Sequence, residues 1–95
     1  MKITVEFLSL PKLTRIFGKK SIEFDFPGRT IAELIEYLAR TGGPEAGRFL
    51  LDESGRFDMH FRLLLNEQEW ITSETMDRQL AEGDKLRIMM LVGGG

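Results

Sequence analysis

The sequence ends with Lys85-Leu86-Arg87-Ile88-Met89-Met90-Leu91-Val92-Gly93-Gly94-Gly95. Residues 85–92 of this stretch predict a β-strand, because charged and apolar residues alternate from 85 to 88 and residues 89–92 are all apolar. Three glycines follow directly. Glycine has no Cβ, so this segment fits a channel too narrow for side chains, and five extended residues span roughly 17 Å. The other interpretation is a frayed end or a remnant of cloning.

Two stretches near the start of the chain also alternate. The odd-numbered positions of residues 2–8 are apolar from Ile3 onward, and residues 21–26 repeat the pattern before Pro27-Gly28. We expect two half-buried strands, joined by a link whose apolar residues fold over the edge of the sheet. We also expect the first and last strands to pair in parallel at the centre of the sheet, with the termini at opposite ends.

One amphipathic helix is predicted after residue 30. Thr30 followed by Glu33 is a capping-box signature. Apolar residues then recur at helical spacing at positions 31, 34, 35 and 38, so that one stripe faces the sheet. We expect the helix to end at Gly42, in a left-handed cap. Residues 44–58 are either a short helix or an irregular crossover.

A second hairpin follows this stretch. Residues 61–65 and 68–71 read as strands around the tight turn Asn66-Glu67, and residues 72–82 are polar with Met76 and Leu80 facing inward. The order strand, strand, helix, strand, strand, strand predicts a two-layer α+β domain.

Composition restricts the class of protein. A chain of 95 residues forms one domain. No apolar run is long enough to span a membrane and the start does not resemble a signal peptide, so we expect a soluble cytoplasmic protein. The absence of cysteine excludes disulfides, zinc–thiolate sites and a cysteine nucleophile. A net charge of −2 argues against a nucleic-acid partner.

Charge is unevenly distributed along the chain. Residues 1–20 carry five Lys or Arg against Glu6, whereas residues 66–84 carry six acids against Arg78. A solvated surface is the ordinary explanation of such runs, and a local basic patch is the alternative.

Catalytic equipment is sparse. His60 is the only histidine, and a lone histidine at the start of a strand is typical of a surface or packing residue. The glycines of residues 42–49 have the spacing of a phosphate-binding loop, but Arg48-Phe49 replace the required Lys and Ser/Thr. Glu67 and Glu69 have no histidine or cysteine pattern beside them. We therefore expect no metal site and no bound cofactor.

The apolar run before the glycines has two interpretations. A central strand covered on both sides would explain it, and so would an exposed patch for a partner beside the tail, made by Met89, Leu91 and Val92. Trp70 is expected to pack in the core or at an edge, with an interface anchor as the alternative.

The only chemical group of the glycine tail is its carboxylate, which resists nucleophilic attack until it is activated. Adenylation by a partner enzyme would make it reactive toward sulfide, a persulfide or an amine. The chain has no nucleotide-binding motif of its own, so the partner must supply the catalysis.

The whole chain resembles the MoaD/ThiS family of sulfur carriers, which share the ubiquitin-like β-grasp fold. Three segments carry the resemblance: the hairpin Leu65-Asn66-Glu67-Gln68, the approach to the last strand Leu80-Ala81-Glu82-Gly83-Asp84-Lys85-Leu86, and the glycine end. The resemblance implies an α+β β-grasp domain over residues 1–92, with a mixed four- to five-stranded sheet on one main helix, and a flexible tail over residues 93–95.

The resemblance also implies the chemistry. Such proteins are not enzymes: a ubiquitin-activating-type enzyme uses ATP to adenylate the last glycine, which becomes a thiocarboxylate. Gly95 would be the reactive residue, unless it is trimmed to expose Gly94, and Gly93 and Gly94 would thread the active site. The sulfur acceptor would be molybdopterin or its tungsten counterpart through a MoaE-like synthase subunit, or the thiamin thiazole through a thiazole synthase. The length and residues 44–58 are closer to the MoaD branch.

Two other functions remain open. A ubiquitin-like modifier uses the same terminus to form isopeptide bonds with lysines, and a β-grasp binding module would have an inert tail. The sequence does not distinguish sulfur transfer from conjugation.

Overall fold

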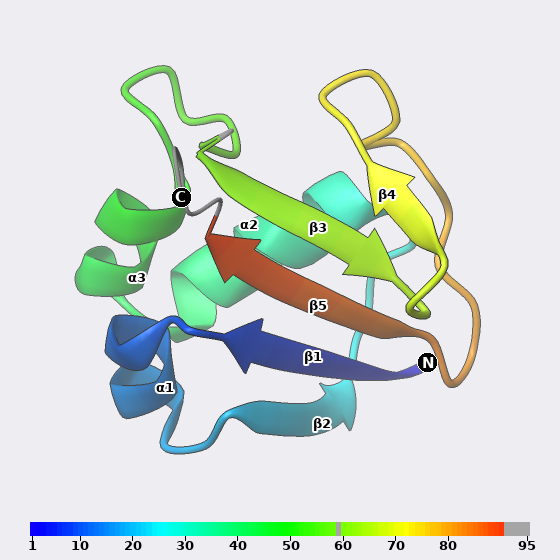
Figure 1. Cartoon of the computed structure of the whole chain (residues 1–95), viewed down its shortest axis with the longest axis horizontal. Coiled ribbons are helices and arrows are strands. Elements are labelled where there is room, and N and C mark those ends of the chain that lie inside the picture. Colours follow the sequence, from blue (N-terminus) through cyan, green and yellow to red (C-terminus); the bar gives the residue numbers. More distant parts are fainter. Residues whose placement is uncertain (59, 91–95) are drawn as a thin grey trace.

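A mixed five-stranded sheet with one long helix across one face forms the protein (Figure 1). The computed structural model describes residues 1–58 and 60–90. The strands are β1 (Lys2–Leu8), β2 (Ser21–Asp25), β3 (Phe61–Leu65), β4 (Glu69–Ile71) and β5 (Lys85–Met90), and the helices are α1 (Pro11–Phe17), α2 (Ile31–Thr41) and α3 (Pro44–Leu50).

The spatial strand order is β2-β1-β5-β3-β4. Only the central pair, β1 and β5, is parallel, with register from Thr4 opposite Lys85 to Leu8 opposite Met89. The other neighbours are antiparallel. The predicted α+β class and the parallel central pair are therefore confirmed, and β1 begins at the end of the sheet opposite to the one where β5 ends.

Helix α2 begins as its capping box predicts. The Thr30 hydroxyl accepts a hydrogen bond from the Glu33 backbone N–H at 3.2 Å, and the Glu33 carboxylate accepts one from the Thr30 backbone N–H at 3.0 Å. The apolar stripe of the helix is at most 1% exposed and consists of Ile31, Leu34, Ile35 and Leu38. Burial of each such side chain stabilises the fold by about 1.5–3 kcal/mol.

The inner face of the sheet packs against α2. The residues of β1, β3 and β5 that point inward are buried, namely Ile3, Val5, Phe7, Phe61, Leu63, Leu65, Leu86 and Ile88. The alternate residues of the same strands lie on the opposite, outer face, which no described helix covers (Figure 1). The fold thus leaves one face of the sheet open.

The first link is more regular than the sequence predicted, and one expectation about a glycine is wrong. The β1–β2 link is helical, starting at Pro11 and ending at Gly18, whose φ is +83°. The left-handed position after α2 is Gly43, with φ +85°, and not Gly42, with φ −80°. Gly42 is instead required by space, because a Cβ there would lie 2.5 Å from the Ala46 Cβ.

The stretch after α2 combines both of its predicted forms. Pro44–Leu50 is the short helix α3, and an irregular segment from Asp52 leads to β3. In the second hairpin, the Leu65 carbonyl accepts a hydrogen bond from the Gln68 N–H at 3.1 Å, so β4 begins at Glu69.

Asn66 connects the second hairpin to the turn before β5. Its φ of 53° lies in the left-handed region, as a two-residue hairpin turn requires. Its Nδ2 donates to Asp84 Oδ1 and its Oδ1 accepts from the Lys85 N–H, both at 2.9 Å. Asp84 Oδ2 also accepts from the Ala81 N–H at 2.8 Å. Two segments that carry the family resemblance therefore hold each other in place.

Replacing Asn66 with alanine should destabilise the domain by about 1–3 kcal/mol, since the Lys85 N–H and Asp84 lose a partner and alanine tolerates a positive φ poorly. Urea denaturation measures the free energy of unfolding. Gln68→Ala, in the same turn and exposed, is the matched control and should stay within about 0.5 kcal/mol of wild type. Equal stability of the two variants would contradict this role for Asn66.

Candidate functional site

The expected tail residues Gly93, Gly94 and Gly95, together with Leu91 and Val92, lie outside the described residues. Their proposed roles therefore stay predictions. The structure describes the end of β5 that carries them and the surface around it.

Strand β5 is the centre of the sheet, with β1 on one side and β3 on the other. At its end Met89 lies opposite Leu8 of β1 and opposite Arg62 of β3. These three residues share the outer face of the sheet. Leu8 is 46% exposed and Met89 is half-buried, whereas Met90 is 43% exposed. The described end of β5 is therefore not covered on both sides. This favours the other interpretation of the apolar run, an exposed patch beside the tail.

The apolar surface continues toward the β4 edge. Leu64 lies opposite Trp70 on the same outer face, and the Trp70 side chain is 58% exposed. Of the two expected places for Trp70, the core is excluded by this exposure, and the residue lies on the edge strand β4, of which only Ile71 is buried. Accessible apolar side chains on one face of a sheet, here the half-buried Leu64 beside the exposed Trp70, are typical of interaction sites. We call Leu8, Leu64, Trp70 and Met89, together with Arg62, the outer-face patch.

A cluster of four charges lies beside this patch, toward the start of β5. Arg87 donates from Nε to Glu6 Oε1 and from Nη2 to Glu67 Oε1, the latter at 2.8 Å. The Lys85 Nζ lies 3.5 Å from Glu6 Oε2 and 3.6 Å from Glu67 Oε1. Two cations and two carboxylates neutralise one another. The cluster therefore leaves Arg62 without an ion pair on the outer face of the described sheet.

These contacts shift protonation equilibria. The hydrogen bond from Arg87 lowers the pKa of the Glu6 carboxyl below its ordinary value of 4.5, although desolvation opposes the shift. The same hydrogen bond, which Arg87 donates to Glu6, raises the pKa of Arg87, although desolvation opposes the shift, and the hydrogen bond to Glu67 contributes further. Glu67, which the sequence suggested as part of a solvated surface with Glu69, is thus an ion-pair partner, and Glu69 pairs with Arg78 at 3.0 Å.

His60 lies one residue before Phe61, which is opposite Met90 in the sheet. Its Nδ1 lies 2.6 Å from Asp58 Oδ1, and its backbone N–H donates to the same oxygen at 2.9 Å. These two contacts, the backbone one first, lower the pKa of Asp58. The His60 side chain is 88% exposed, as expected for a surface residue. Within residues 1–58 and 60–90, no group of three or more potential ligands forms a metal site.

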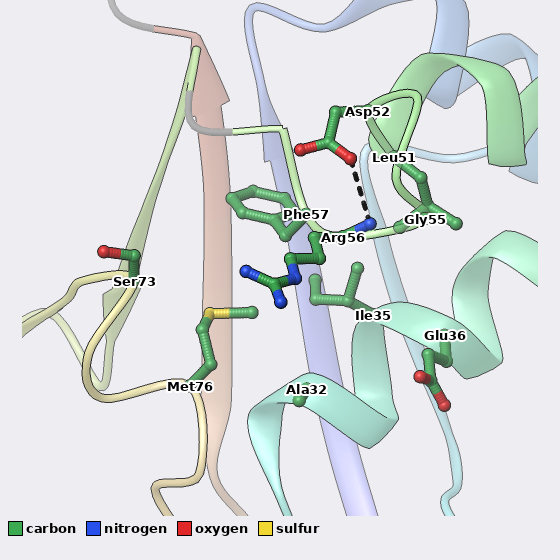
Figure 2. Close-up of a pocket in the computed structure, with 10 residues that line it drawn as sticks. All are labelled: Ala32, Ile35, Glu36, Leu51, Asp52, Gly55, Arg56, Phe57, Ser73 and Met76. Atoms are coloured by element: carbon green, nitrogen blue, oxygen red, sulfur yellow. Dashed lines mark hydrogen bonds between the residues drawn. The ribbon is translucent and has the colours of Figure 1, made fainter.

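A pocket of about 450 Å³ opens on the helix side of the molecule, away from the outer-face patch (Figure 2). Ile35, Phe57 and Met76 form its apolar wall, and Figure 2 shows the Arg56 guanidinium between them. Two carboxylates also line the pocket, those of Glu36 and Asp52, whose negative charge is opposite to that of Arg56. Asp52 accepts a hydrogen bond from the Arg56 backbone N–H at 3.1 Å. This bond stabilises the turn between the two residues and does not involve the Arg56 guanidinium.

No protein-family model matches the sequence, and no curated protein matches it. Solved structures do. SAMP1, small archaeal modifier protein 1, from Haloferax volcanii has a TM-score of 0.78 at 20% identity over 100% of both chains. A chain of the BexX/CysO complex from Amycolatopsis orientalis has a TM-score of 0.69 at 25% identity over 98% of this chain and 99% of that one.

A Pyrococcus furiosus protein assigned as molybdopterin converting factor, subunit 1, has a TM-score of 0.70 at 18% identity, over 97% of this chain and 99% of that one. These likenesses cover nearly the full length of each chain. This chain has the ubiquitin-like β-grasp fold. The fold implied by the sequence resemblance is thereby confirmed. None of the described helices is long and apolar enough to cross a membrane.

Sequence reasoning identified Met89 but missed three members of the outer-face patch. Leu8, Arg62 and Leu64 come from two strands, and only the strand register shows that they flank Met89 and Trp70. The alternation of each strand contained a partial signal, because Leu8 and Leu64 are apolar at positions whose neighbours on the same face are polar.

The charge cluster predicts a specific acid sensitivity. Because the folded pKa of Glu6 is lowered, its stabilising contribution is present above pH 4.5 and is lost as the pH falls through the folded pKa. Glu6→Gln should therefore lower stability at pH 7 and flatten the loss of stability below pH 4.5. Urea midpoints at several pH values measure this. Glu23→Gln, exposed on the neighbouring strand, is the control and should retain the wild-type slope.

Proposed function

We propose that this chain is a sulfur carrier, a protein cosubstrate whose C-terminal glycine carboxylate is adenylated by a partner enzyme and converted to a thiocarboxylate in the cytoplasm. The observation that carries the proposal is the direct sequence from the central strand β5 of a β-grasp domain into a glycine-only segment, beside an exposed apolar patch. A central strand is held by hydrogen bonds on both sides, so it presents its continuation at a defined place.

The chemistry proceeds in two balanced steps. In the first step, a carboxylate oxygen of Gly95 attacks the α-phosphorus of ATP, and pyrophosphate leaves. In the second step, hydrosulfide attacks the carbonyl carbon of the acyl adenylate, and AMP leaves with the C–O bond pair, which produces the thiocarboxylate. Glycine leaves the reacting carbon unhindered. If Gly95 is trimmed first, Gly94 takes the same role.

The partner is a ubiquitin-activating-type adenylating enzyme, which we propose docks on the outer-face patch. Met89 is the member of the patch nearest to the tail in sequence, and Leu91 and Val92 would extend the contact. Trp70 and Arg62 belong to the residue types that most often anchor interfaces. The covered inner face of the sheet is unavailable for this contact because α2 packs on it.

The acceptor of the sulfur is proposed to be a pterin, molybdopterin or its tungsten counterpart, through a MoaE-like synthase subunit. The name of the Pyrococcus furiosus neighbour, a molybdopterin converting factor, supports this choice over the thiamin thiazole. The BexX/CysO complex supports a carrier that associates with a second protein, since CysO is the name of another β-grasp neighbour.

The second candidate is a ubiquitin-like modifier, which the name of SAMP1 favours. In that case the amine of a lysine attacks the activated glycine carbonyl and forms an isopeptide bond. Both candidates use the same carboxylate, and they differ in the nucleophile that captures it.

Protein purified from its native host should show, by intact mass, a terminus heavier by the difference between a sulfur and an oxygen atom. Larger conjugates in place of that species would favour the modifier. Deletion of Gly94 and Gly95 should abolish carrier-dependent ATP–pyrophosphate exchange by the purified adenylating enzyme of the same host. The deletion leaves the folded core intact, so unchanged exchange would refute both chemical proposals and leave only a binding module with an inert tail.

Met89→Asp should raise the KM of the adenylating enzyme for the carrier on the order of tenfold, because it places a charge in an apolar contact. The half-buried position means that the domain should still fold, which circular dichroism checks. Gln68→Asp adds the same charge at the far end of the sheet and should leave KM unchanged. Equal KM values for the two variants would remove Met89 from the interface.

A further inference from the structure

Helix α1 and the loop after it form an exposed basic surface at the end of the sheet where β5 ends. Residues 7–22 contain four cations and no acid. All four are exposed and are Lys12, Arg15, Lys19 and Lys20. Among residues 1–58 and 60–90, none of them takes part in an ion pair. We call these four residues the α1 basic surface.

The fold places this surface beside the end of β5 at Met90, which we call the root of the tail. Leu8, the last residue of β1, lies opposite Met89, and α1 begins three residues later at Pro11. The chain then returns to the same end of the sheet, because the Phe7 N–H donates to the Lys20 carbonyl at 2.7 Å and the Phe7 and Phe17 rings stack at 5.4 Å. Figure 1 shows α1 at the end toward which the arrows of β1 and β5 point.

Helix α3 lies beside the basic surface and adds one exposed cation, Arg48, and one exposed carboxylate, Glu45. The Lys12 Nζ lies 5.5 Å from the centre of the Phe49 ring, which joins α1 to α3, and the exposed Arg48 is the neighbour of Phe49. On the β3 side of the tail root the charge is different, since the segment from Asp52 to Asp58 carries three carboxylates and Arg56. Positive charge therefore predominates on the β1 side, while Arg62 of β3 is a further exposed cation opposite Met89.

The segment between β4 and β5 is mainly acidic, with Arg78 as its one cation. Glu74, Asp77 and Glu82 are exposed in the segment between β4 and β5. In Figure 1 this segment lies at the end of the sheet away from α1. Summed charges of this kind orient a protein as it approaches a charged partner, and they act mainly on the association rate.

We propose that the α1 basic surface orients this carrier, tail end first, onto an acidic surface that flanks the tail channel of its adenylating partner. The inference rests on the proposed function. It adds that the partner's surface is acidic and that the partner approaches the carrier from the α1 side. The outer-face patch supplies the short-range apolar contact, and the α1 basic surface supplies the long-range attraction. Its effect is on the association rate and falls as salt increases.

A protein partner fits this surface better than a nucleic acid. The whole chain has a net charge of −2, whereas nucleic-acid-binding domains are strongly basic. Two aromatic rings lie beside the surface, that of Phe49 near Lys12 and that of Phe17 in α1, and both are half-buried, which disfavours stacking on a base.

The test measures association of the carrier with the purified adenylating enzyme of the same host by stopped-flow fluorescence at low, intermediate and high salt. Lys12→Glu with Arg15→Glu should lower the association rate constant on the order of tenfold at low salt. The difference should vanish at high salt, and the maximal rate of adenylation should be unchanged. Lys12→Gln with Arg15→Gln is a milder change and should lower the association rate constant by a smaller factor. It replaces the charge-reversal variant in the test if that variant does not fold.

The matched control is Lys2→Glu with Arg29→Glu, which makes the same charge change at exposed sites away from α1 and should leave the association rate near that of wild type. If the α1 variants and the control associated at equal rates, the inference would be overturned. The proposed function would still stand in that case, provided that the carrier were adenylated. Salt-sensitive binding of a single-stranded RNA 20-mer that the α1 variants abolish would also overturn it, in favour of a nucleic-acid partner. A wild-type carrier that is not adenylated at all would refute the proposed function and this inference together.

Discussion

The parallel hydrogen-bonded pairing of β1 with β5 is the constraint on which the rest of the structure depends. It places the last strand of the chain at the centre of the sheet, between β1 and β3. It also makes both strands end at the same side of the molecule, so that Leu8 and Met89 are neighbours and α1 follows immediately. The root of the tail, the apolar patch and the basic helix are therefore brought together by one pairing.

The two faces of the sheet have different roles because only one of them is covered. The inner face supplies the core with α2, and every inward residue of β5 up to Ile88 is buried. The outer face keeps its apolar residues accessible, and the ion pairs among Glu6, Glu67, Lys85 and Arg87 consume the charges in the middle of it. An apolar surface with neutralised charges is suited to close contact with a partner, since little charge has to be desolvated.

At the start of β5, Asn66 has a complementary structural role. Its side chain fixes the β3–β4 hairpin against Asp84 and Lys85, far from the end that carries the tail. Two of the segments that carry the resemblance to sulfur carriers thus have a structural role at the start of β5, and the third, the glycine end, follows the other end of that strand in the sequence.

The sequence by itself determined the elements and the fold class. Period-two alternation in β1, β2 and β5, the Thr30 and Glu33 capping box and the Asn66-Glu67 turn are local signals, and local sterics and hydrogen bonding suffice to read them. It also supplied the glycine terminus as the reactive candidate. It misplaced the left-handed glycine after α2, because Gly42 and Gly43 are equivalent locally and only the contact of Gly42 with Ala46 and Phe17 distinguishes them.

Only the tertiary structure decided which residues surround the tail root. Leu8, Arg62 and Met89 are separated by many positions in the sequence, and strand register brings them together through hydrogen bonds that no local pattern encodes. The exposure of Trp70 likewise follows from its place on the open face of an edge strand. The charges of residues 7–22 became one surface only because α1 folds back over the end of β1. Long-range pairing and helix packing, and not composition, therefore assembled the candidate site.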